Sequence, residues 1–469
     1  MTAMRLNSPR ITVAGLSGDS GKTLVSLGLT RSLRDRGLMV RTAKKGPDYI
    51  DAAWLAAASG SSCTNLDSFL MSDEAIGSAA WNLRGADLVL IEGNRGLYDG
   101  ADTEGTHSTA ELAKLLRAPV ILVVDVTKAT RTVAAVVLGC REMDSRVRLG
   151  GVVLNRVGTA RQEAIIRRAV EETTGVPVLG AIPRIAGSDP LPGRHLGLVT
   201  VAEHPERELA IARAADAVAA NVDLEGVVEL AREAPPVELP MLRLEIESSP
   251  VRVGYFADAA FSFYYPENLD CLRTHGAELV AIGPQIDAGL PEIDALYIGG
   301  GFPELHAERL GNNRKLAIDL SKRVEAGLPV FAECGGLMYL AREIRVDGST
   351  YPMAGVLDLV VEQNPRPMGH GYEVAIVDRD NPFFESGFRL AGHEFHYSQV
   401  VGGDDRERTV LGVERGTGVG GGRDGIVNGR VWASYLHLHA LATPGWADGF
   451  LRLASEFAAE RAGSAVAWA

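Results

Sequence analysis

The chain has 469 residues, more than one hydrophobic core usually organises, so at least two domains are expected. Its 46% hydrophobic and 23% charged residues are typical of a soluble globular protein. A formal net charge of −13 argues against a nucleic-acid partner, because phosphate neutralisation needs a basic surface, but it permits a small anionic ligand.

No segment is long and apolar enough for a membrane helix, and the first residues lack the apolar core of a signal peptide. The cysteines Cys63, Cys140, Cys271 and Cys334 are scattered, without a CxxC pair. This spacing indicates neither a zinc site nor a disulfide framework. We therefore expect a cytoplasmic protein without a membrane partner.

The first half of the chain alternates short apolar runs with helical patterns. Strands are predicted over residues 11–14, 39–43, 88–91, 120–124 and 151–154, and a helix over 23–36. Continuous apolar runs are typical of strands covered on both faces, and their alternation with helices predicts βαβ units. Residues 1–230 are therefore expected to form an α/β domain with a parallel sheet of the P-loop NTPase type.

The sequence GLSGDSGKT, residues 15–23, follows the first strand and opens the first helix, which is the context of a phosphate-binding loop. Gly18 and Gly21 would let backbone N–H groups turn toward phosphate oxygens. Lys22 would reach the phosphates of ATP, and the Thr23 hydroxyl would hold Mg²⁺. The loop is one residue longer than the common form. The alternative is a glycine-rich turn that happens to contain a lysine.

Two acidic residues follow predicted strands and could order Mg²⁺. Glu92 comes directly after residues 88–91, and Asp125 comes after residues 120–124. Carboxyl ends of strands line the ligand crevice of open α/β sheets, and the position favours Glu92. Either carboxylate could instead be a surface charge.

The second strand is followed by an unusual density of charge, in Lys44, Lys45, Asp48 and Asp51. Cations here could neutralise a phosphoryl group in transfer, and the carboxylates could bind Mg²⁺. A solvated loop with internally paired charges is the alternative.

Residues 231–250 are rich in proline and charge and show no period, so they are predicted to be a linker. A second α/β domain is expected over residues 251–469. Its predicted strands begin at residue 251 and cover residues 295–298, 330–332 and 431–435.

Cys334 ends an apolar run and precedes two glycines and a helical pattern, as in a nucleophile elbow. The helix N-terminus would favour the thiolate, and the backbone N–H of Gly335 would be free for an oxyanion. Gly300 and Gly301, in a glycine-rich turn after another strand, can supply further N–H groups. The alternative is that Cys334 is a small buried hydrophobe, as most free cysteines are.

A thiol nucleophile needs a base, and ASYLHLH at residues 433–439 closes a late strand. Alternation would place Tyr435, His437 and His439 on one face. His437 is the predicted base, and His439 either orients it or is a core histidine. The cluster GHEFHYS, residues 392–398, lacks metal-site spacing and is expected to be a polar strand pair, with substrate contact as the lesser alternative.

Several motifs together resemble the cobyrinate a,c-diamide synthase family of tetrapyrrole carboxamide synthases. They are the long phosphate loop, KGPDYID, IEGNRGLYDG, FSFYYPENL, GGGFPELHA, AECGG and ASYLHLH. The first half is similar to dethiobiotin synthetase. The second half resembles class I glutamine amidotransferases, which implies a flavodoxin-like α/β fold.

This resemblance implies a coupled reaction. Cys334, assisted by His437, would hydrolyse L-glutamine through a thioester and release ammonia. ATP and Mg²⁺ would activate the a and c acetates of a tetrapyrrole, best cobyrinate or hydrogenobyrinate, as acyl phosphates, which ammonia converts to amides in cobalamin biosynthesis. A homodimer is left open.

The resemblance also implies site residues in the first half. Lys22, Thr23, Lys44, Asp48 and Glu92 would carry the chemistry of ATP and phosphoryl transfer, with Thr23, Asp48 and Glu92 on the metal. Other matched positions complete the implied site: Asn155 for the base of the nucleotide, and Asp48, Tyr49 and Asp51 for the substrate.

The chain departs from the family pattern at Lys45, Ala52 and His439, the last of which stands where a triad glutamate is usual. The first two leave sirohaem or nickel-sirohydrochlorin as alternative acceptors, and the third suggests a Cys–His dyad. A P-loop switch ATPase with a degenerate amidotransferase-like domain is the alternative of another class. A stand-alone carboxylate kinase would leave the second half unexplained.

Overall fold

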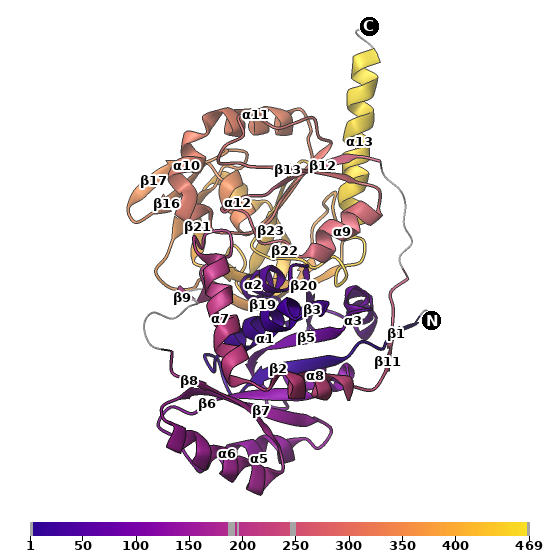
Figure 1. The fold of residues 1–469 in the computed structure, drawn as a ribbon. Coiled ribbons are helices and arrows are strands. Elements are labelled where there is room, and N and C mark those ends of the chain that lie inside the picture. The colour runs from indigo at the N-terminus through magenta and orange to yellow at the C-terminus, as the bar shows by residue number, and fades with distance from the viewer. Residues whose placement is uncertain (1–2, 186–192, 195–196, 244–249, 467–469) are drawn as a thin grey trace. The chain divides into compact units, whose positions relative to one another are not determined.

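The structure is a computed structural model that describes residues 3–185, 193–194, 197–243 and 250–466. It contains two compact units, Met1–Arg243 and Leu244–Ala469 (Figure 1). Among the described residues, every helix is too short or too polar to cross a membrane.

The first unit is built on a seven-stranded sheet in the order β4-β3-β5-β2-β6-β7-β8, and all its strand pairs are parallel. The strands are β2 (Arg10–Gly15), β3 (Val40–Lys45), β4 (Cys63–Leu66), β5 (Leu88–Gly96), β6 (Val120–Asp125), β7 (Leu149–Val157) and β8 (Val178–Pro183). All five predicted strands and the parallel sheet are thus confirmed. β5 runs past its predicted end, so Glu92 lies inside the strand.

Helices flank this sheet as in other βαβ arrangements. They are α1 (Lys22–Asp35), α2 (Ile50–Ser59), α3 (Asp73–Ala79), α4 (Thr109–Leu115), α5 (Thr132–Met143), α6 (Ala160–Thr174), α7 (Arg207–Asn221) and α8 (Leu224–Arg232). Helix α1 packs on α7, and α5 packs beside α6 (Figure 1). The close approach of α1 and α7 requires Gly28, since a Cβ there would lie 2.5 Å from the Ala214 carbonyl oxygen.

The predicted linker over residues 231–250 is wrong in its first part. Helix α8 continues to Arg232, and β11 (Val237–Pro240) pairs with β1 (Ala3–Leu6) in antiparallel register. Because β11 has only four residues and its partner lies over 230 positions away in the sequence, no local period revealed it. Residues 244–249 of the predicted linker lie outside the described part of the chain.

The second unit contains a nine-stranded sheet in the order β13-β12-β14-β15-β24-β23-β22-β19-β20. Its strands are β12 (Arg252–Phe256), β13 (Glu278–Ile282), β14 (Ala295–Ile298), β15 (Val330–Glu333), β19 (Gly369–Val377), β20 (Arg389–His396), β22 (Thr409–Arg415), β23 (Arg423–Asn428) and β24 (Val431–Ser434). The stretch from β13 to β24 is parallel, in the order 2-1-3-4-5 of flavodoxin-like folds. The predicted fold class is confirmed.

A smaller four-stranded sheet and several helices complete this unit. The sheet contains β16 (Glu343–Val346), β17 (Ser349–Pro352), β18 (Val360–Gln363) and β21 (Ser398–Gly402). The helices are α9 (Pro266–Thr274), α10 (Ala307–Asn312), α11 (Arg314–Glu325), α12 (Gly335–Leu340) and α13 (Trp446–Val466). Phe331 of β15 stacks on Trp432 of β24, with ring centroids 5.6 Å apart, and both rings belong to one buried hydrophobic cluster.

Candidate active sites

The phosphate loop joins β2 to α1 through a left-handed residue, Gly21, with φ of 91°. A Cβ on Gly21 would lie 2.0 Å from Nδ2 of Asn155, so both the backbone angle and the space require glycine. Asn155, near the end of β7, donates from Nδ2 to the carbonyl oxygen of Ser20 at 3.0 Å. Gly18 has open space where a side chain would be, so packing alone does not require glycine there.

Lys22 folds back over this loop. Its Nζ donates to the carbonyl oxygen of Ser17 at 2.8 Å. Burial and the neighbouring ammonium of Lys44 lower the pKa of Lys22. A bound polyphosphate would compensate both effects, because an anion in the loop offers the ammonium a stronger partner than a carbonyl group.

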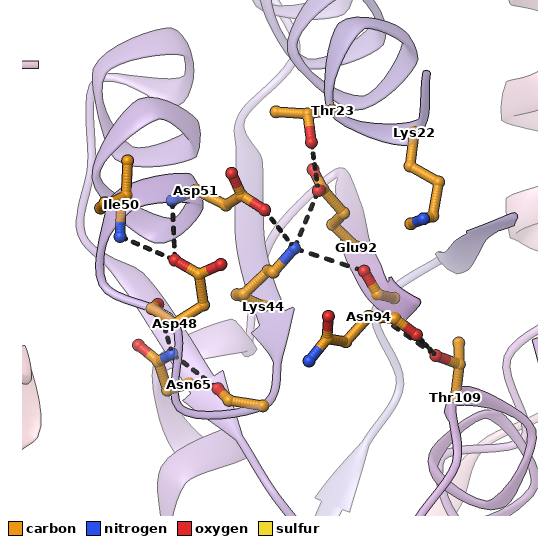
Figure 2. Close-up of polar contacts among 12 residues, drawn as sticks. Lys22, Thr23, Lys44, Asp48, Ile50, Asp51, Asn65, Glu92, Asn94 and Thr109 are labelled. Atoms are coloured by element: carbon orange, nitrogen blue, oxygen red, sulfur yellow. Dashed lines mark hydrogen bonds and ion pairs between the residues drawn. The ribbon is translucent and has the colours of Figure 1, made fainter. Parts of the chain in front are cut away.

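Lys44, at the end of β3, is the centre of a buried ionic cluster (Figure 2). Its Nζ lies 2.6 Å from Oδ2 of Asp51 and 2.9 Å from Oε1 of Glu92. The Thr23 hydroxyl donates to the same Glu92 oxygen at 2.9 Å. The β3–β5 register places Lys44 opposite Glu92, which is how residues 48 positions apart come together.

The charges of this cluster are strongly coupled. Burial disfavours the Lys44 cation, but Asp51, Glu92 and Asp48 outweigh burial and raise its pKa above the ordinary value. Burial raises the pKa of Glu92, although Lys44 opposes the rise. Burial and the Asp51 carboxylate raise the pKa of Asp48 to about 7. The cluster therefore needs a cation to keep its carboxylates charged together.

One oxygen of the cluster is poised for a further cation. Oε2 of Glu92 is buried without a hydrogen-bond partner among the described residues. The Thr23 hydroxyl bonds to Oε1, the other oxygen of the same carboxylate. Mg²⁺ typically takes one or two carboxylates together with substrate phosphates. The donor set therefore fits Mg²⁺. Asp48 also caps the start of α2, where its Oδ1 accepts the N–H groups of Ile50 and Asp51 at 2.8 and 3.0 Å.

Asp125, the other candidate carboxylate, is already engaged. Its Oδ2 pairs with Arg156 at 2.5 Å, and its Oδ1 accepts the N–H of Thr127 at 2.8 Å. Glu92 is thus the better placed of the two. Asn65 of β4, which belongs to no recognised motif, donates from Nδ2 to the carbonyl oxygens of Gly46 and Asp48 and holds the turn after β3.

In the second unit, Cys334 forms a strained turn between β15 and α12. Its φ of 48° and ψ of −100° are rare for a residue with a side chain. Its N–H donates to the carbonyl oxygen of Ser434 at 2.7 Å, which fixes the turn against the end of β24. Burial, and after it the carboxylate of Glu304, raise the pKa of the thiol. A base must therefore assist ionisation.

The predicted glycine turn lies against both Cys334's helix and His437. A Cβ on Gly335 would lie 3.0 Å from the backbone nitrogen of Gly301, and a Cβ on Gly300 would lie 2.4 Å from Cε1 of His437. The structure thus brings the turn, the elbow and the histidine together. Backbone N–H groups of Gly300, Gly301 and Gly335 remain the predicted donors to an oxyanion.

His437 lies three residues beyond the end of β24 at Ser434, so the strand alternation expected over Tyr435–His439 does not hold. Its ring instead stacks on that of His393, with centroids 4.7 Å apart. Burial, with the neighbouring His393 and His396, lowers the pKa of His437 well below the ordinary value. Burial therefore favours the neutral imidazole, and it makes His437 a weaker base than an imidazole in water.

His439 has an acidic neighbour that the sequence analysis missed. Its Nε2 lies 3.5 Å from Oε2 of Glu267, and both side chains are buried. Glu267 begins α9 within the FSFYYPENL motif, so the motif was noted but its carboxylate was not assigned. In the GHEFHYS cluster, Glu394 accepts the N–H groups of Thr417 and Gly418 at 2.6 and 2.9 Å.

Glu333, immediately before Cys334, is a second buried carboxyl group without a predicted role. Its Oε2 accepts the Tyr297 hydroxyl at 2.8 Å, and its Oε1 accepts the N–H of Leu438 at 2.9 Å. Burial raises the pKa of Glu333 to about 8, although its two hydrogen bonds act in the opposite direction and lower the pKa. Glu333 connects the end of β15, directly before Cys334, to the segment that carries His437.

Comparison with known proteins identifies both units. Residues 252–445 match the CobB/CobQ-like glutamine amidotransferase domain, and residues 71–191 match an AAA domain. Cobyrinate a,c-diamide synthases of Magnetococcus marinus, Archaeoglobus fulgidus and Dehalococcoides mccartyi strain CBDB1 are 41%, 40% and 41% identical to this chain. These alignments cover 95%, 97% and 96% of the chain and 97%, 99% and 99% of the three proteins.

The fold and these matches define a glutamine-dependent ligase. The chain belongs to the cobyrinate a,c-diamide synthase family, as the motifs predicted. The AAA match begins beyond the phosphate loop, so the roles of Lys22 and Thr23 depend on the loop's own geometry.

Lys44→Met is expected to lower the free energy of unfolding of the first unit by about 3–5 kcal/mol, because it leaves buried carboxylates without their cation. Lys114→Met is the matched control. Lys114 also pairs with two carboxylates, Glu111 and Asp144, but their side chains are 44% and 19% exposed. That loss should stay below about 1 kcal/mol. Urea denaturation followed by circular dichroism measures both, and equal losses would contradict the account of the cluster.

Glu333 gives the fold a pH dependence. Its ordinary pKa of 4.5 rises to about 8 on folding, so the native state retains a proton that the unfolded chain releases. Between these values, stability contributed by the neutral group falls as pH rises. Glu333→Gln should therefore gain stability relative to the wild type between about pH 5 and pH 8. Thermal unfolding across this range measures the difference, and a pH-independent difference would refute the assignment.

Proposed function

We propose that this protein converts the a and c acetate side chains of a tetrapyrrole, best cobyrinate or hydrogenobyrinate, to primary amides with ATP and glutamine. The observation that carries the proposal is the similarity to proteins named cobyrinate a,c-diamide synthase over almost the whole of both chains. A relative that shared only one unit would not support a coupled reaction.

In the glutaminase half, the Cys334 thiol gives its proton to His437 and the thiolate attacks the side-chain carbonyl of glutamine. The oxyanion that forms accepts hydrogen bonds from backbone N–H groups of Gly300, Gly301 and Gly335. Collapse to a thioester releases ammonia, with the proton returned from His437. Water then releases glutamate and restores the thiol.

In the ligase half, ATP with Mg²⁺ supplies the phosphoryl group. Lys22 and Lys44 neutralise phosphate charge, and Thr23, Glu92 and Asp48 would hold the metal. An acetate oxygen of the acceptor attacks the terminal phosphorus, the bond from that phosphorus to the bridging oxygen breaks, ADP leaves, and an acyl phosphate forms. Ammonia then attacks the acyl carbon, phosphate leaves, and the amide remains. The proposal assigns Asn155 to the nucleotide base.

Acceptor contacts are proposed for Asp48, Tyr49 and Asp51 at the start of α2. Lys45 is the residue that favours a second candidate, a sirohaem or nickel-sirohydrochlorin acceptor. It lies at the end of β3 beside Lys44, it is only 5% exposed, and the Asp67 carboxylate offsets part of the burial that lowers its pKa. A second cation at this position would favour an acceptor with a different arrangement of carboxylates.

Cys334→Ala is expected to abolish glutamine-driven amidation while amidation driven by ammonium chloride persists, because ammonia then bypasses the thiol. Cys271→Ala is the matched control, since Cys271 is a free cysteine of the same unit. Product mass and glutamate release measure the two activities. Undiminished glutamate release by the Cys334 variant would refute the nucleophile.

The acceptor is tested with ATP, glutamine and a panel of cobyrinate, hydrogenobyrinate and sirohaem. Cobyrinate or hydrogenobyrinate is expected to gain two amides, read as two mass decreases of about 1 Da each when a carboxyl group becomes a carboxamide. Amidation of sirohaem alone would favour the second candidate. No mass change on any acceptor would refute the tetrapyrrole assignment.

A further inference from the structure

The segment that carries His437 follows the end of β24 and is not part of the sheet. β24 ends at Ser434, and residues 435–440 continue without a regular ladder apart from a single bridge between His437 and His393. All of Tyr435–Ala440 is buried. Outside this bridge, the backbone N–H and C=O groups of the segment need other partners within the protein, because water does not reach them.

Asp424, Glu333 and Asn268 are three of the buried side chains that supply these partners. Asp424 accepts the N–H groups of Tyr435 and Leu436, each at 3.1 Å from Oδ2. Glu333 and Asn268 bind the backbone of Leu438, the residue directly after His437. Oε1 of Glu333 accepts the Leu438 N–H at 2.9 Å, and Asn268 donates to the Leu438 carbonyl oxygen at 2.8 Å. Asn268 also accepts the N–H of Ala440 at 2.7 Å.

Tyr297 connects the two partners of Leu438. Nδ2 of Asn268 donates to the Tyr297 hydroxyl at 3.1 Å, and that hydroxyl donates to Oε2 of Glu333 at 2.8 Å. Asn268, Tyr297 and Glu333 are all 0% exposed. Both backbone groups of Leu438 are thus held by one closed network, here called the Leu438 clamp: Glu333, Tyr297 and Asn268.

We propose that Glu333 and Asn268 are positioning residues for His437, acting through the backbone of Leu438. The inference rests on the proposed roles of Cys334 and His437. Glu333 directly precedes Cys334, and Leu438 directly follows His437. A single hydrogen bond therefore joins the neighbour of the nucleophile to the neighbour of the base and sets the distance between them.

The hydrogen bonds to Leu438 explain why buried positions 333 and 268 carry polar side chains. An apolar side chain at 333 would leave the buried Leu438 N–H without an acceptor, at a cost of roughly 1–3 kcal/mol. The segment would then shift to recover a partner. A displacement of about 1 Å in a catalytic group is enough to cost about 100-fold in rate. The same network gives Asn268, in the FSFYYPENL motif, a structural role beside the proposed chemistry of Cys334 and His437.

The test compares Glu333→Ala with Glu333→Gln in the full-length protein. The alanine variant should lose about 100-fold in glutaminase kcat, with KM changed less than about threefold, because the substrate contacts remain. The glutamine variant should recover most of that loss, since its amide oxygen can still accept the Leu438 N–H. Amidation driven by ammonium chloride should match the wild type in both.

Asp294→Ala is the control for loss of stability alone. Asp294 is also a buried carboxylate that accepts a backbone N–H, that of Arg252 at 2.8 Å. It precedes β14, whereas the site follows the end of that strand. This variant should lower the unfolding temperature without changing glutaminase kcat. Tyr297→Phe, which removes one hydroxyl, tests the clamp if Glu333→Ala does not fold, and should lose about tenfold in kcat.

The positioning role would be overturned by a wild-type kcat in Glu333→Ala or in Tyr297→Phe. It would also be overturned if Glu333→Gln had no higher kcat than Glu333→Ala, or if Asp294→Ala lost as much kcat as Glu333→Ala. Wild-type protein without glutaminase activity would instead refute the proposed function, and this inference with it. Active wild type, inactive Cys334→Ala and fully active Glu333→Ala would refute the clamp alone.

Discussion

Polar groups at the carboxyl ends of buried strands must find partners, and both units are organised around that constraint. In the first unit the ammonium of Lys44 stands between Asp51 and Glu92. In the second unit Glu333 ends β15 and accepts the N–H of Leu438. Glu92 lies 48 positions from Lys44 and Leu438 lies 105 positions from Glu333, so closing each sheet also assembles its site.

The two sites use burial in opposite ways. The first is rich in charge, and its carboxylates stay charged only while cations are present, which suits a site for phosphates and a metal. In the second, burial raises the pKa of both Cys334 and Glu333 and lowers that of His437, which favours the neutral form of each group. Thiolate formation there has to be coupled to a proton acceptor at the moment of reaction.

Local sequence patterns predicted the features that depend on residues close together in the chain, namely strands and tight turns. Continuous apolar runs located five of the seven strands in the first sheet and four of the nine in the second. Glycine spacing located the tight turns at Gly21 and Cys334. Three features were not predictable in this way: the pairing of β11 with β1, the contact of Glu267 with His439, and the hydrogen bond from Leu438 to Glu333. Each depends on the register of segments far apart in the chain. The end of β24 at Ser434 was not predicted, because the sequence pattern of a strand continues through residues 435–439. The backbone of these residues bonds mainly to side chains and no longer to a neighbouring strand.

The pairing of β11 with β1 has a consequence for how this protein can be divided or recombined. The strand that completes the first unit lies after its last helix, and it covers β1 in antiparallel register through Pro240. A gene fusion that exchanged the ligase half at the end of α8 would leave β1 with an open edge, which favours association with other chains. Modular exchange between relatives therefore has to carry residues through Pro240 for the transferred half to remain self-contained.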